Sequence, residues 1–280
     1  MSNSSGSNQF RLTSATLSDV GSVRTVNEDA FLEAPDIGLW AVADGMGGHE
    51  GGQIASRAVI DSLDCTPDLS SEAAFVKDIR ERLIAANHRI GAISQEYFAG
   101  RVIGSTVTIL LVYDRKAVCL WVGDSRLYLF RDGRLRQVNR DHTAVAELVE
   151  QDLLTAEEMD HHSLRNVITR AVGAHDELEV DYREQEIRPG DVMILCTDGL
   201  NKVVSDEEIA STLSGGTPEH MAHELLRMAL ARNAPDNVTV SVVQAADASM
   251  RDGDGPDKTA PSTEDTMNLA PQERPVPPRG

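Results

Sequence analysis

The stretch STVTILLVYDRKAVCLWVGDSRLYLFRDGRLRQV, residues 105–138, decides the fold class because it holds several apolar runs in close succession. The runs Ser105–Tyr113, Ala117–Val122 and Arg126–Phe130 are separated by only a few residues each. Asp132-Gly133 then gives a two-residue hairpin signal before the next run. Strands joined so closely are expected to pair antiparallel, since parallel strands need a long crossover. The stretch therefore predicts an antiparallel sheet.

Further strands and helices are predicted on both sides of this stretch. Apolar runs predict strands at Leu39–Ala43, Val192–Cys196 and Val238–Val243. Helical spacing of apolar residues predicts helices over Gly52–Leu63, Glu72–Ile93 and Pro218–Arg232, and Ser205 before Glu208 forms a capping box for a shorter helix. Together these elements predict an α+β fold in which helices pack outside antiparallel sheets.

The composition excludes several classes of function. With 45 acidic and 26 basic residues, the 280-residue chain has a net charge of −19, which opposes general binding to nucleic acid or to anionic membranes. The three cysteines, Cys65, Cys119 and Cys196, form no CxxC pair, so a zinc ribbon or a redox motif has no support. Cys119 and Cys196 lie in apolar runs and are expected to be buried.

Composition also divides the chain into three parts. Residues 1–8 are mostly Ser, Gly and Asn, and residues 247–280 form an acidic tail rich in Pro and Thr; both are expected to be disordered. Residues 9–246 are expected to form one folded domain. The N-terminus has no apolar segment typical of a signal peptide, and no apolar run reaches the length of a membrane span. We therefore expect a cytoplasmic protein.

Acidic residues stand where predicted strands begin or end. Asp44, Asp124 and Asp198 each follow an apolar strand and precede a glycine or serine, and Asp236 comes just before the strand at Val238. Such strand ends can meet at one rim of a sheet, where converging carboxylates repel one another unless a cation lies between them. Ligands that offer only oxygen favour Mg²⁺ or Mn²⁺ over zinc. One Asp-Gly pair would indicate only a turn, but four such aspartates raise the hypothesis of a metal centre.

Seven motifs occur in the order and spacing seen in one protein family. They are RTVNEDAF (24–31), VADGMGGHEGG (42–52), GSTVTILLV (104–112), VGDSRLYLF (122–130), ITRAVG (168–173), GDVMILCTDGL (190–200) and PDNVTVSVV (235–243). In these motifs the chain resembles the bacterial metal-dependent Ser/Thr protein phosphatases, the PPM family or type 2C, over about residues 9–245. The resemblance implies a four-layer α-β-β-α sandwich of two antiparallel sheets, with a dimetal centre in the cleft at one end.

The same resemblance implies the ligands of the two core metals. Asp44 corresponds to the aspartate that bridges the two ions, and Gly45 to the glycine whose carbonyl binds the second ion. Asp198 and Asp236 correspond to the remaining carboxylates of the first ion. The glycines after Asp44 would then let the loop and the start of the next helix approach the cleft.

Four further residues receive roles from the resemblance. Glu28 and Asp29 correspond to an acidic pair that meets the second metal directly or through water. Asp124 corresponds to the aspartate that binds a third metal together with Asp198. Arg24 corresponds to the arginine that holds the substrate phosphate, a bidentate task that suits a guanidinium group.

The implied activity is hydrolysis of phosphoserine and phosphothreonine in proteins by a metal-activated water, with Arg24, Asp44, Asp198 and Asp236 as the catalytic set. The implied cofactors are Mn²⁺ or Mg²⁺, as two core ions and a third, weaker one. The expected partners are phosphorylated proteins, in bacteria a Ser/Thr kinase and its targets. We expect a monomer that binds no nucleic acid and has no membrane span.

Two regions depart from the family pattern or leave alternatives open. Animal members use a histidine proposed as a general acid, and Met46 after the Asp-Gly pair cannot replace it; His49 is a candidate, against its interpretation as a solvated loop residue. Residues 139–164 fall where bacterial members carry a mobile flap. The flap histidines, His142, His161 and His162, fit no zinc motif, so we expect a surface flap.

Two rival functions keep the same ligand types. A pseudophosphatase would keep the fold as a scaffold but would lack metal aspartates, and here every one is present. A metal-dependent nuclease is disfavoured by the acidic composition. Turnover of a phosphopeptide or of single-stranded DNA, with and without Mn²⁺, separates these hypotheses.

Overall fold

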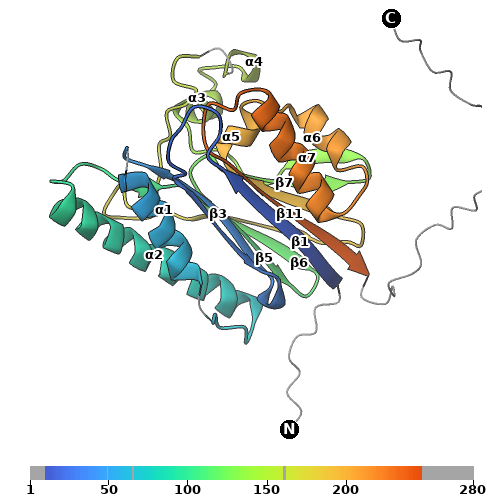
Figure 1. The fold of residues 1–280 in the computed structure, drawn as a ribbon. Helices are drawn as coiled ribbons and strands as arrows, with labels where there is room; N and C mark the ends of the chain where they lie inside the picture. Colours follow the sequence, from blue (N-terminus) through green and yellow to red (C-terminus); the bar gives the residue numbers. More distant parts are fainter. Residues whose placement is uncertain (1–9, 49, 65, 160–161, 248–280) are drawn as a thin grey trace, which may run out of the picture. The chain divides into compact units, whose positions relative to one another are not determined.

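The structure, a computed structural model, describes residues 10–48, 50–64, 66–159 and 162–247 (Figure 1). These residues belong to a unit that spans Met1–Ala248. His49, Cys65 and His161 lie outside the described residues, as do residues 1–8 and the tail from residue 248, so the expectations for them remain predictions. Within the described part of the chain, no helix combines the length and apolar character that crossing a bilayer requires.

Two antiparallel sheets form the centre of this unit. The first has the strand order β1-β11-β10-β7-β8, and the second has the order β2-β3-β5-β6-β9, with β4 beside β3. The strands of the first sheet are β1 (Phe10–Asp19), β7 (Arg126–Arg131), β8 (Arg134–Gln137), β10 (Val192–Cys196) and β11 (Val238–Asp247). Those of the second are β2 (Asp29–Ala34), β3 (Leu39–Met46), β4 (Gly104–Ser105), β5 (Val107–Tyr113), β6 (Lys116–Val122) and β9 (Asp181–Glu186).

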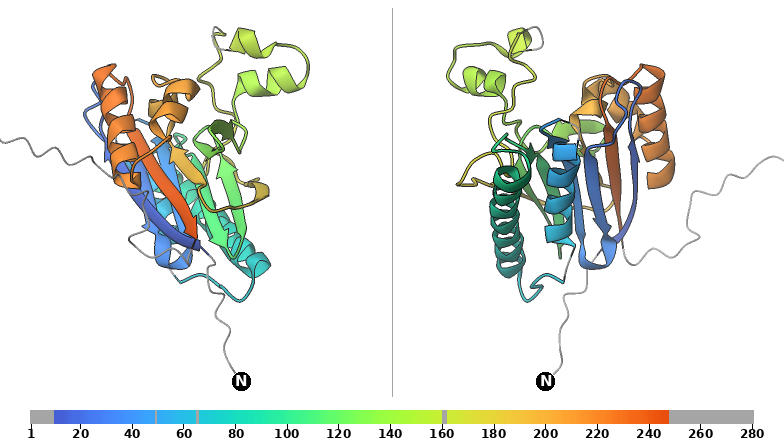
Figure 2. Two further views of the ribbon diagram at one scale, coloured as in Figure 1. Left: turned by 90° about the vertical axis from the view of Figure 1, so that its right-hand side faces the viewer. Right: turned by 60° about the vertical axis from the view of Figure 1, so that its left-hand side comes forward.

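Apolar side chains from both sheets fill the space between them. Trp40 and Leu110 of the second sheet share one buried cluster with Leu127, Met193 and Val243 of the first. Successive side chains of a strand point to opposite faces, so each central strand packs one set inward and presents the other set to the helices. Figure 2 shows the two sheets as adjacent layers.

Helices cover the outer face of each sheet (Figure 2). The second sheet packs against α1 (Glu50–Leu63) and α2 (Glu72–Tyr97), and the first packs against α5 (Asp198–Asn201), α6 (Asp206–Thr212) and α7 (Pro218–Ala231). The predicted capping box is present at the start of α6: the Ser205 hydroxyl accepts a hydrogen bond from the Glu208 N–H, and the Glu208 carboxylate accepts one from the Ser205 N–H.

The predicted α+β, α-β-β-α sandwich is therefore confirmed. The predicted hairpin at Asp132-Gly133 joins β7 to β8, and the predicted helix from Glu72 continues to Tyr97. Three strands, β1, β2 and β9, lie where the sequence analysis predicts none. All three are at a sheet edge, and β9, with the sequence DYREQE, is largely exposed and lacks a clear apolar alternation.

Two short helices lie between β8 and β9. They are α3 (Ala144–Glu150) and α4 (Ala156–Met159), within the stretch 139–164. Figure 2 shows α3 and α4 standing out from the layers of the sandwich. We call residues 139–164 the flap segment. Earlier in the chain, a short 3-10 turn, Pro35–Ile37, joins β2 to β3.

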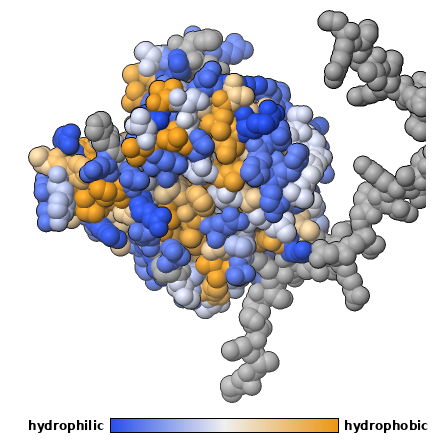
Figure 3. Space-filling model, in the orientation of Figure 1, coloured by the Kyte–Doolittle hydropathy of each residue, from blue (hydrophilic) through white to orange (hydrophobic). Residues whose placement is uncertain are grey.

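The surface mixes polar and apolar residues. On the face shown in Figure 3, hydrophobic side chains are interspersed with hydrophilic ones. Large apolar side chains that are exposed include Val23, Tyr97 and Leu153, which come from separate elements. Scattered apolar residues of this kind are normal on a folded protein.

Candidate metal centre

Asp29 and Asp44 lie opposite each other where β2 pairs with β3. Asp29 also links the two sheets, because its Oδ2 accepts hydrogen bonds from the hydroxyls of Thr197 (2.8 Å) and Thr239 (2.7 Å). Its Oδ1 is buried and has no hydrogen-bond partner among the described residues. One oxygen of Asp29 is thus committed to the fold, and the other is available to a ligand.

Close approach of the backbone explains the glycines after Asp44. A Cβ on Gly45 would lie 2.1 Å from the carbonyl oxygen of Gly52, and a Cβ on Gly52 would lie 2.4 Å from Oε1 of Glu28. The end of β3, the first turn of α1 and the Glu28 carboxylate therefore meet with no room for a side chain. The Glu28 carboxylate lies beside the N-terminal turn of α1, where the helix dipole favours negative charge.

The other sheet contributes Asp198, directly after β10, and Asp236, just before β11. Oδ2 of Asp236 accepts a hydrogen bond from Nη2 of Arg24 at 2.9 Å. Arg24 lies on the loop between β1 and β2, and Asn237 fixes this loop. Its Oδ1 accepts a hydrogen bond from the N–H of Glu28 at 2.8 Å, and its Nδ2 donates to two carbonyls of the loop.

Asp124 is positioned by a turn that requires glycine. It follows β6 through Gly123, whose φ is +105°, and a Cβ at Gly123 would lie 2.6 Å from the side chain of Thr106. The N–H of Gly123 donates to Nδ1 of His142 at 3.0 Å, and its carbonyl accepts from the N–H of His142 at 2.9 Å. Asp124 itself is only 8% exposed. The turn therefore holds a buried carboxylate in place.

His142 is buried, which corrects the expectation that it is a surface residue of the flap. Its ring stacks on Trp121, with 6.0 Å between the ring centroids, and its Nε2 lies 3.2 Å from Oδ2 of Asp181. Because Nδ1 accepts the hydrogen bond of Gly123, the neutral ring carries its proton on Nε2 and donates it to Asp181. Burial lowers the pKa of His142, which favours this neutral form.

Five aspartates form what we call the carboxylate cluster: Asp29, Asp44, Asp124, Asp198 and Asp236. The pKa values of the first four are raised, in part by the charges of their neighbours in the cluster. Burial, with a further contribution from the charge of Asp198, raises the pKa of Asp29 and the pKa of Asp124 to about 7 each. Burial is also the main cause that raises the pKa of Asp44 well above its usual value, and the other four carboxylates add to it. The cluster therefore joins residues of both sheets into one electrostatic unit.

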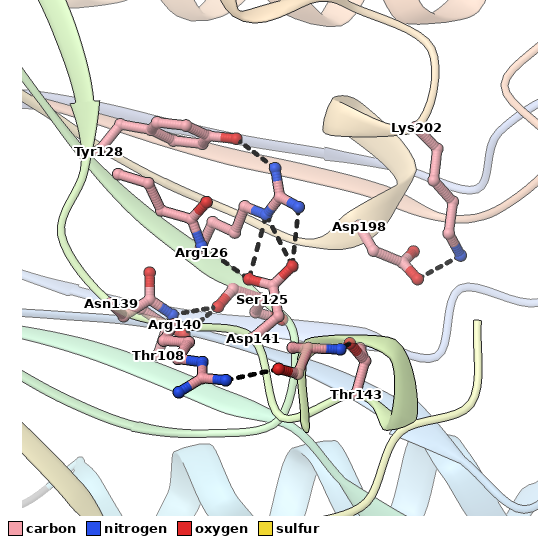
Figure 4. Close-up of polar contacts among 12 residues, drawn as sticks. Thr108, Ser125, Arg126, Tyr128, Asn139, Arg140, Asp141, Thr143, Asp198 and Lys202 are labelled. Atoms are coloured by element: carbon pink, nitrogen blue, oxygen red, sulfur yellow. Dashed lines mark hydrogen bonds and ion pairs between the residues drawn. The ribbon is translucent and has the colours of Figure 1, made fainter. Parts of the chain in front are cut away.

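Two cations contact the cluster. Arg24 binds Asp236 as described, and the ammonium of Lys202 contacts Oδ2 of Asp198 (Figure 4). Among the described residues, no group of three or more Asp, Glu, His or Cys side chains has the arrangement of a ready-formed metal site. The residues nevertheless fit a divalent ion, because Oδ1 of Asp29 and Oδ1 of Asp198 are buried without a hydrogen-bond partner in the described part of the chain. A donor set of oxygens alone suits Mg²⁺ or Mn²⁺.

The base of the flap segment is fixed by a partly buried arginine, Arg126 (Figure 4). Nη2 of Arg126 donates to Oδ2 of Asp141 at 2.7 Å, and Nη1 donates to the Tyr128 hydroxyl at 2.8 Å. Nε of Arg126 also donates to Asp141, so the pair is bidentate. The flap segment is thereby tied to β7 of the first sheet.

A cleft of about 680 Å³ separates the carboxylate cluster from the flap segment. Asp124, Asp198 and Lys202 line it on the side of the cluster. Met159 and Arg165 line it from the flap segment and the loop after it. The cleft therefore opens onto two carboxylates of the cluster, those of Asp124 and Asp198.

Several residues of the site escaped the sequence analysis. They are Lys202, Asn237, Thr197, Thr239 and His142. Lys202 had a usable signal, since it stands four residues after Asp198 and residues at this spacing share a helix face. Asn237 follows Asp236 directly, within the motif at residues 235–243, but nothing in the motif indicates its role. The hydroxyls that bind Asp29 come from distant segments and had no local signal.

Comparison with known proteins gives one consistent result. The profile of the family "Protein phosphatase 2C" matches residues 21–231. The chain is 38% identical to the serine/threonine protein phosphatase PstP of Mycobacterium tuberculosis over 233 residues, which cover 83% of this chain but only 45% of PstP. The chain thus spans about half the length of that relative. It is 32% identical to the protein phosphatase PhpP of Streptococcus pneumoniae, with 81% of this chain and 95% of PhpP covered.

Solved structures agree with the sequence comparison. PppA, described as a key regulatory component of T6SS in Pseudomonas aeruginosa, superposes with a TM-score of 0.77 at 43% identity, covering 84% of this chain and 97% of PppA. The catalytic domain of PstP, solved in complex with two manganese ions, gives a TM-score of 0.76 at 37% identity, covering 84% of this chain and 99% of that domain.

Proposed function

Because the chain belongs to the protein phosphatase 2C family, we propose that it hydrolyses phosphoserine and phosphothreonine in proteins, with divalent metal ions as cofactors. The observation that carries this proposal is the carboxylate cluster, in which buried aspartates from both sheets raise one another's pKa values. A concentration of negative charge of this kind is offset by bound cations. The PstP catalytic domain, which binds two manganese ions, supports the same assignment.

We assign the core ligands as follows. Asp44 would be shared by the two ions, Asp198 and Asp236 would hold the first, and the carbonyl of Gly45 would hold the second. The place of Asp44 opposite Asp29, among all the other carboxylates of the cluster, supports its bridging role. The buried, unpartnered Oδ1 of Asp198 supports a ligand role for that residue.

The remaining acidic residues take outer positions in this proposal. Glu28 and Asp29 would meet the second ion directly or through water. Asp29 has one oxygen held by two threonine hydroxyls, which leaves Oδ1 for this contact. Asp124 and Asp198 are the residues for a third, weaker ion. The physiological metal is Mn²⁺ or Mg²⁺, since both accept an oxygen-only set of ligands.

In the reaction, the ions supply Lewis-acid stabilisation of the phosphoryl oxygens and lower the pKa of the attacking water. Arg24 holds the substrate phosphate. One N–H of its guanidinium is used by Asp236 at 2.9 Å, and the half-exposed group has further N–H donors for phosphate oxygens. Its contact with Asp236 keeps it at the edge of the cluster, so that a bound phosphate is oriented toward the ligands.

The proposed substrates are phosphorylated proteins, including a bacterial Ser/Thr kinase and its targets. The cleft beside the cluster gives a peptide access, with Arg165 on its far side as a cation for an acidic or phosphorylated chain. The protein would act as a monomer. A cytoplasmic location is part of the proposal.

The proposal is tested with a phosphothreonine peptide and single-stranded DNA, each with Mn²⁺, with Mg²⁺ and with EDTA. We expect phosphate release from the peptide in either metal and none in EDTA. Asp44→Asn should lose nearly all turnover and at least one ion, because the bridging charge is lost. Asp36→Asn removes an exposed carboxylate between β2 and β3 and should behave as the wild type.

Three results would contradict the proposal. Phosphate release that survives exhaustive EDTA treatment would refute metal dependence. Cleavage of DNA without release of phosphate from the peptide would favour the nuclease, and bound Mn²⁺ without turnover of either substrate would favour the scaffold.

A further inference from the structure

Lys202 holds its ammonium against the carboxylate cluster. It follows α5 directly, and its N–H donates to the carbonyl of Asp198 at 3.0 Å, one helical turn earlier. Its ammonium contacts Oδ2 of Asp198, as Figure 4 shows, and its side chain is 31% exposed. The lysine therefore reaches back along its own turn toward the cluster, and does not extend into solvent.

The position of Lys202 matters because of the two carboxylates beside it. The carboxylates of Asp124 and Asp198 lie in one repulsive cluster, and the positive charge of Lys202 stabilises the ionised form of both. All three residues line the same side of the cleft. They come from two different sheets, since Asp124 follows β6 and Lys202 follows β10 and α5. The ammonium thus lies where charge from both sheets converges.

The two oxygens of Asp198 have different surroundings. Oδ1 is buried without a hydrogen-bond partner among the described residues, whereas Oδ2 contacts the ammonium. One oxygen remains for a core ion while the other is taken by Lys202. An additional ion between Asp198 and Asp124 would meet the positive charge of Lys202 at short range, and like charges at short range repel.

We propose that Lys202 is a built-in cation that competes with a metal ion for Asp198 and Asp124. This inference rests on the proposed function, because it takes the two core ions as given. It adds that the ammonium of Lys202 offsets the negative charge of Asp198 and Asp124, where the third ion would bind. The third ion then binds weakly in the wild type, and the strength of its binding is set by residue 202.

The test is a titration of the metal-free full chain with Mn²⁺ by isothermal calorimetry, with the bound ion counted by electron paramagnetic resonance. Neither readout depends on turnover. We expect two tight ions and a weak third in the wild type. In Lys202→Met the third ion should bind tighter by at least about tenfold, or about 1.4 kcal/mol. Lys202→Arg keeps the charge and should resemble the wild type.

Lys77→Met is the matched control for net charge. Lys77 lies on the exposed face of α2, with its ammonium 3.7 Å from the carboxylate of Glu81, so its removal changes the total charge equally but leaves the cluster alone. Lys202→Gln is a second variant in case Lys202→Met does not fold. Circular dichroism checks the folding of both variants. We expect no change of Mn²⁺ affinity in Lys77→Met.

Two outcomes overturn the inference, and they are distinguishable. If Lys202→Met and Lys202→Gln bind the third ion no tighter than the wild type or Lys77→Met, the role of Lys202 is wrong while the two-ion centre stands. If neither the wild type nor any variant binds Mn²⁺, the proposed metal centre fails and the inference fails with it.

Discussion

Asp29 lies partly buried between the two sheets, yet the fold uses only one of its oxygens. Hydroxyls of Thr197 and Thr239 bind Oδ2, while Oδ1 has no hydrogen-bond partner in the part of the chain that the structure describes. A purely structural carboxylate would satisfy both oxygens, because an unsatisfied buried polar atom costs about 1–3 kcal/mol. The unpaired Oδ1 therefore lowers the stability of the metal-free protein but leaves an oxygen available as a metal ligand.

The first prediction at this scale concerns pH. Burial raises the pKa of Asp29 to about 7 in the folded state, above its value in an unfolded chain. The folded state then binds more protons than the unfolded state between about pH 4 and pH 7, so stability should fall as pH rises through this window. We expect metal-free wild type to lose stability relative to Asp29→Asn over this range, measured by urea unfolding. A constant difference between the two proteins across pH would contradict the raised pKa.

The second residue-scale prediction concerns Asp124. The carboxylate is buried, and its turn is fixed through Gly123 and His142, so it is more than a solvated turn residue. Asp124→Ala should fold and keep two tightly bound ions, since Asp44, Asp198 and Asp236 remain. Turnover should fall at least about tenfold, or about 1.4 kcal/mol in the barrier, because a charge that helps to orient the leaving group is lost. Wild-type turnover at saturating Mn²⁺ would show that Asp124 serves only the turn.

At the scale of elements, the junction of β3 and α1 depends on the absence of side chains. Gly52→Ala would place a Cβ 2.4 Å from Oε1 of Glu28 and 2.7 Å from the carbonyl oxygen of Gly45. We expect this variant to lose about 1–3 kcal/mol of stability through overpacking, and to gain less thermal stability from Mn²⁺ than the wild type. Thermal unfolding with and without Mn²⁺ measures both effects.

Gly91→Ala is the control for that variant. Gly91 lies inside α2, and a Cβ there would meet nothing within 4 Å. Alanine is the better helix former, so this variant should gain about 0.5–1 kcal/mol and keep the wild-type response to Mn²⁺. Equal behaviour of the two variants would mean that the glycines of α1 have no special role.

The same elements explain how much of the fold the sequence could predict. The runs that became β5, β6 and β7 were predicted as strands because each is largely buried on both faces and rich in apolar residues. The edge strands β1, β2 and β9 had no such signal, since pairing with a neighbour defines them more than their own composition does. Asn237, which fixes the loop of Arg24, could not be predicted because its partners are distant in sequence.

At the scale of the whole molecule, the site exists only because two sheets meet. Asp44 belongs to one sheet, and Asp198 and Asp236 lie at strand ends of the other. The sequence could indicate aspartates at strand ends, since that pattern is local. It could not indicate the burial of His142, because that depends on how the flap segment packs against the strands.

The boundary of the domain gives the prediction at this scale. The tail lies outside the described residues, and β11 pairs with β1 up to Asp247 opposite Phe10. A chain that ends after Ala246 should keep full activity on p-nitrophenyl phosphate. A chain that ends after Val238 loses β11, which lies between β1 and β10, and should not fold. A large loss of activity in the first truncation would refute the boundary.

The most direct test of the metal centre is anomalous diffraction from crystals grown with Mn²⁺. We predict two strong anomalous peaks beside Asp44, one shared with Asp198 and Asp236 and the other with the carbonyl of Gly45. Both peaks should disappear in Asp44→Asn or become a single peak. A carboxylate cluster without an anomalous peak, or peaks only elsewhere on the molecule, would contradict this account.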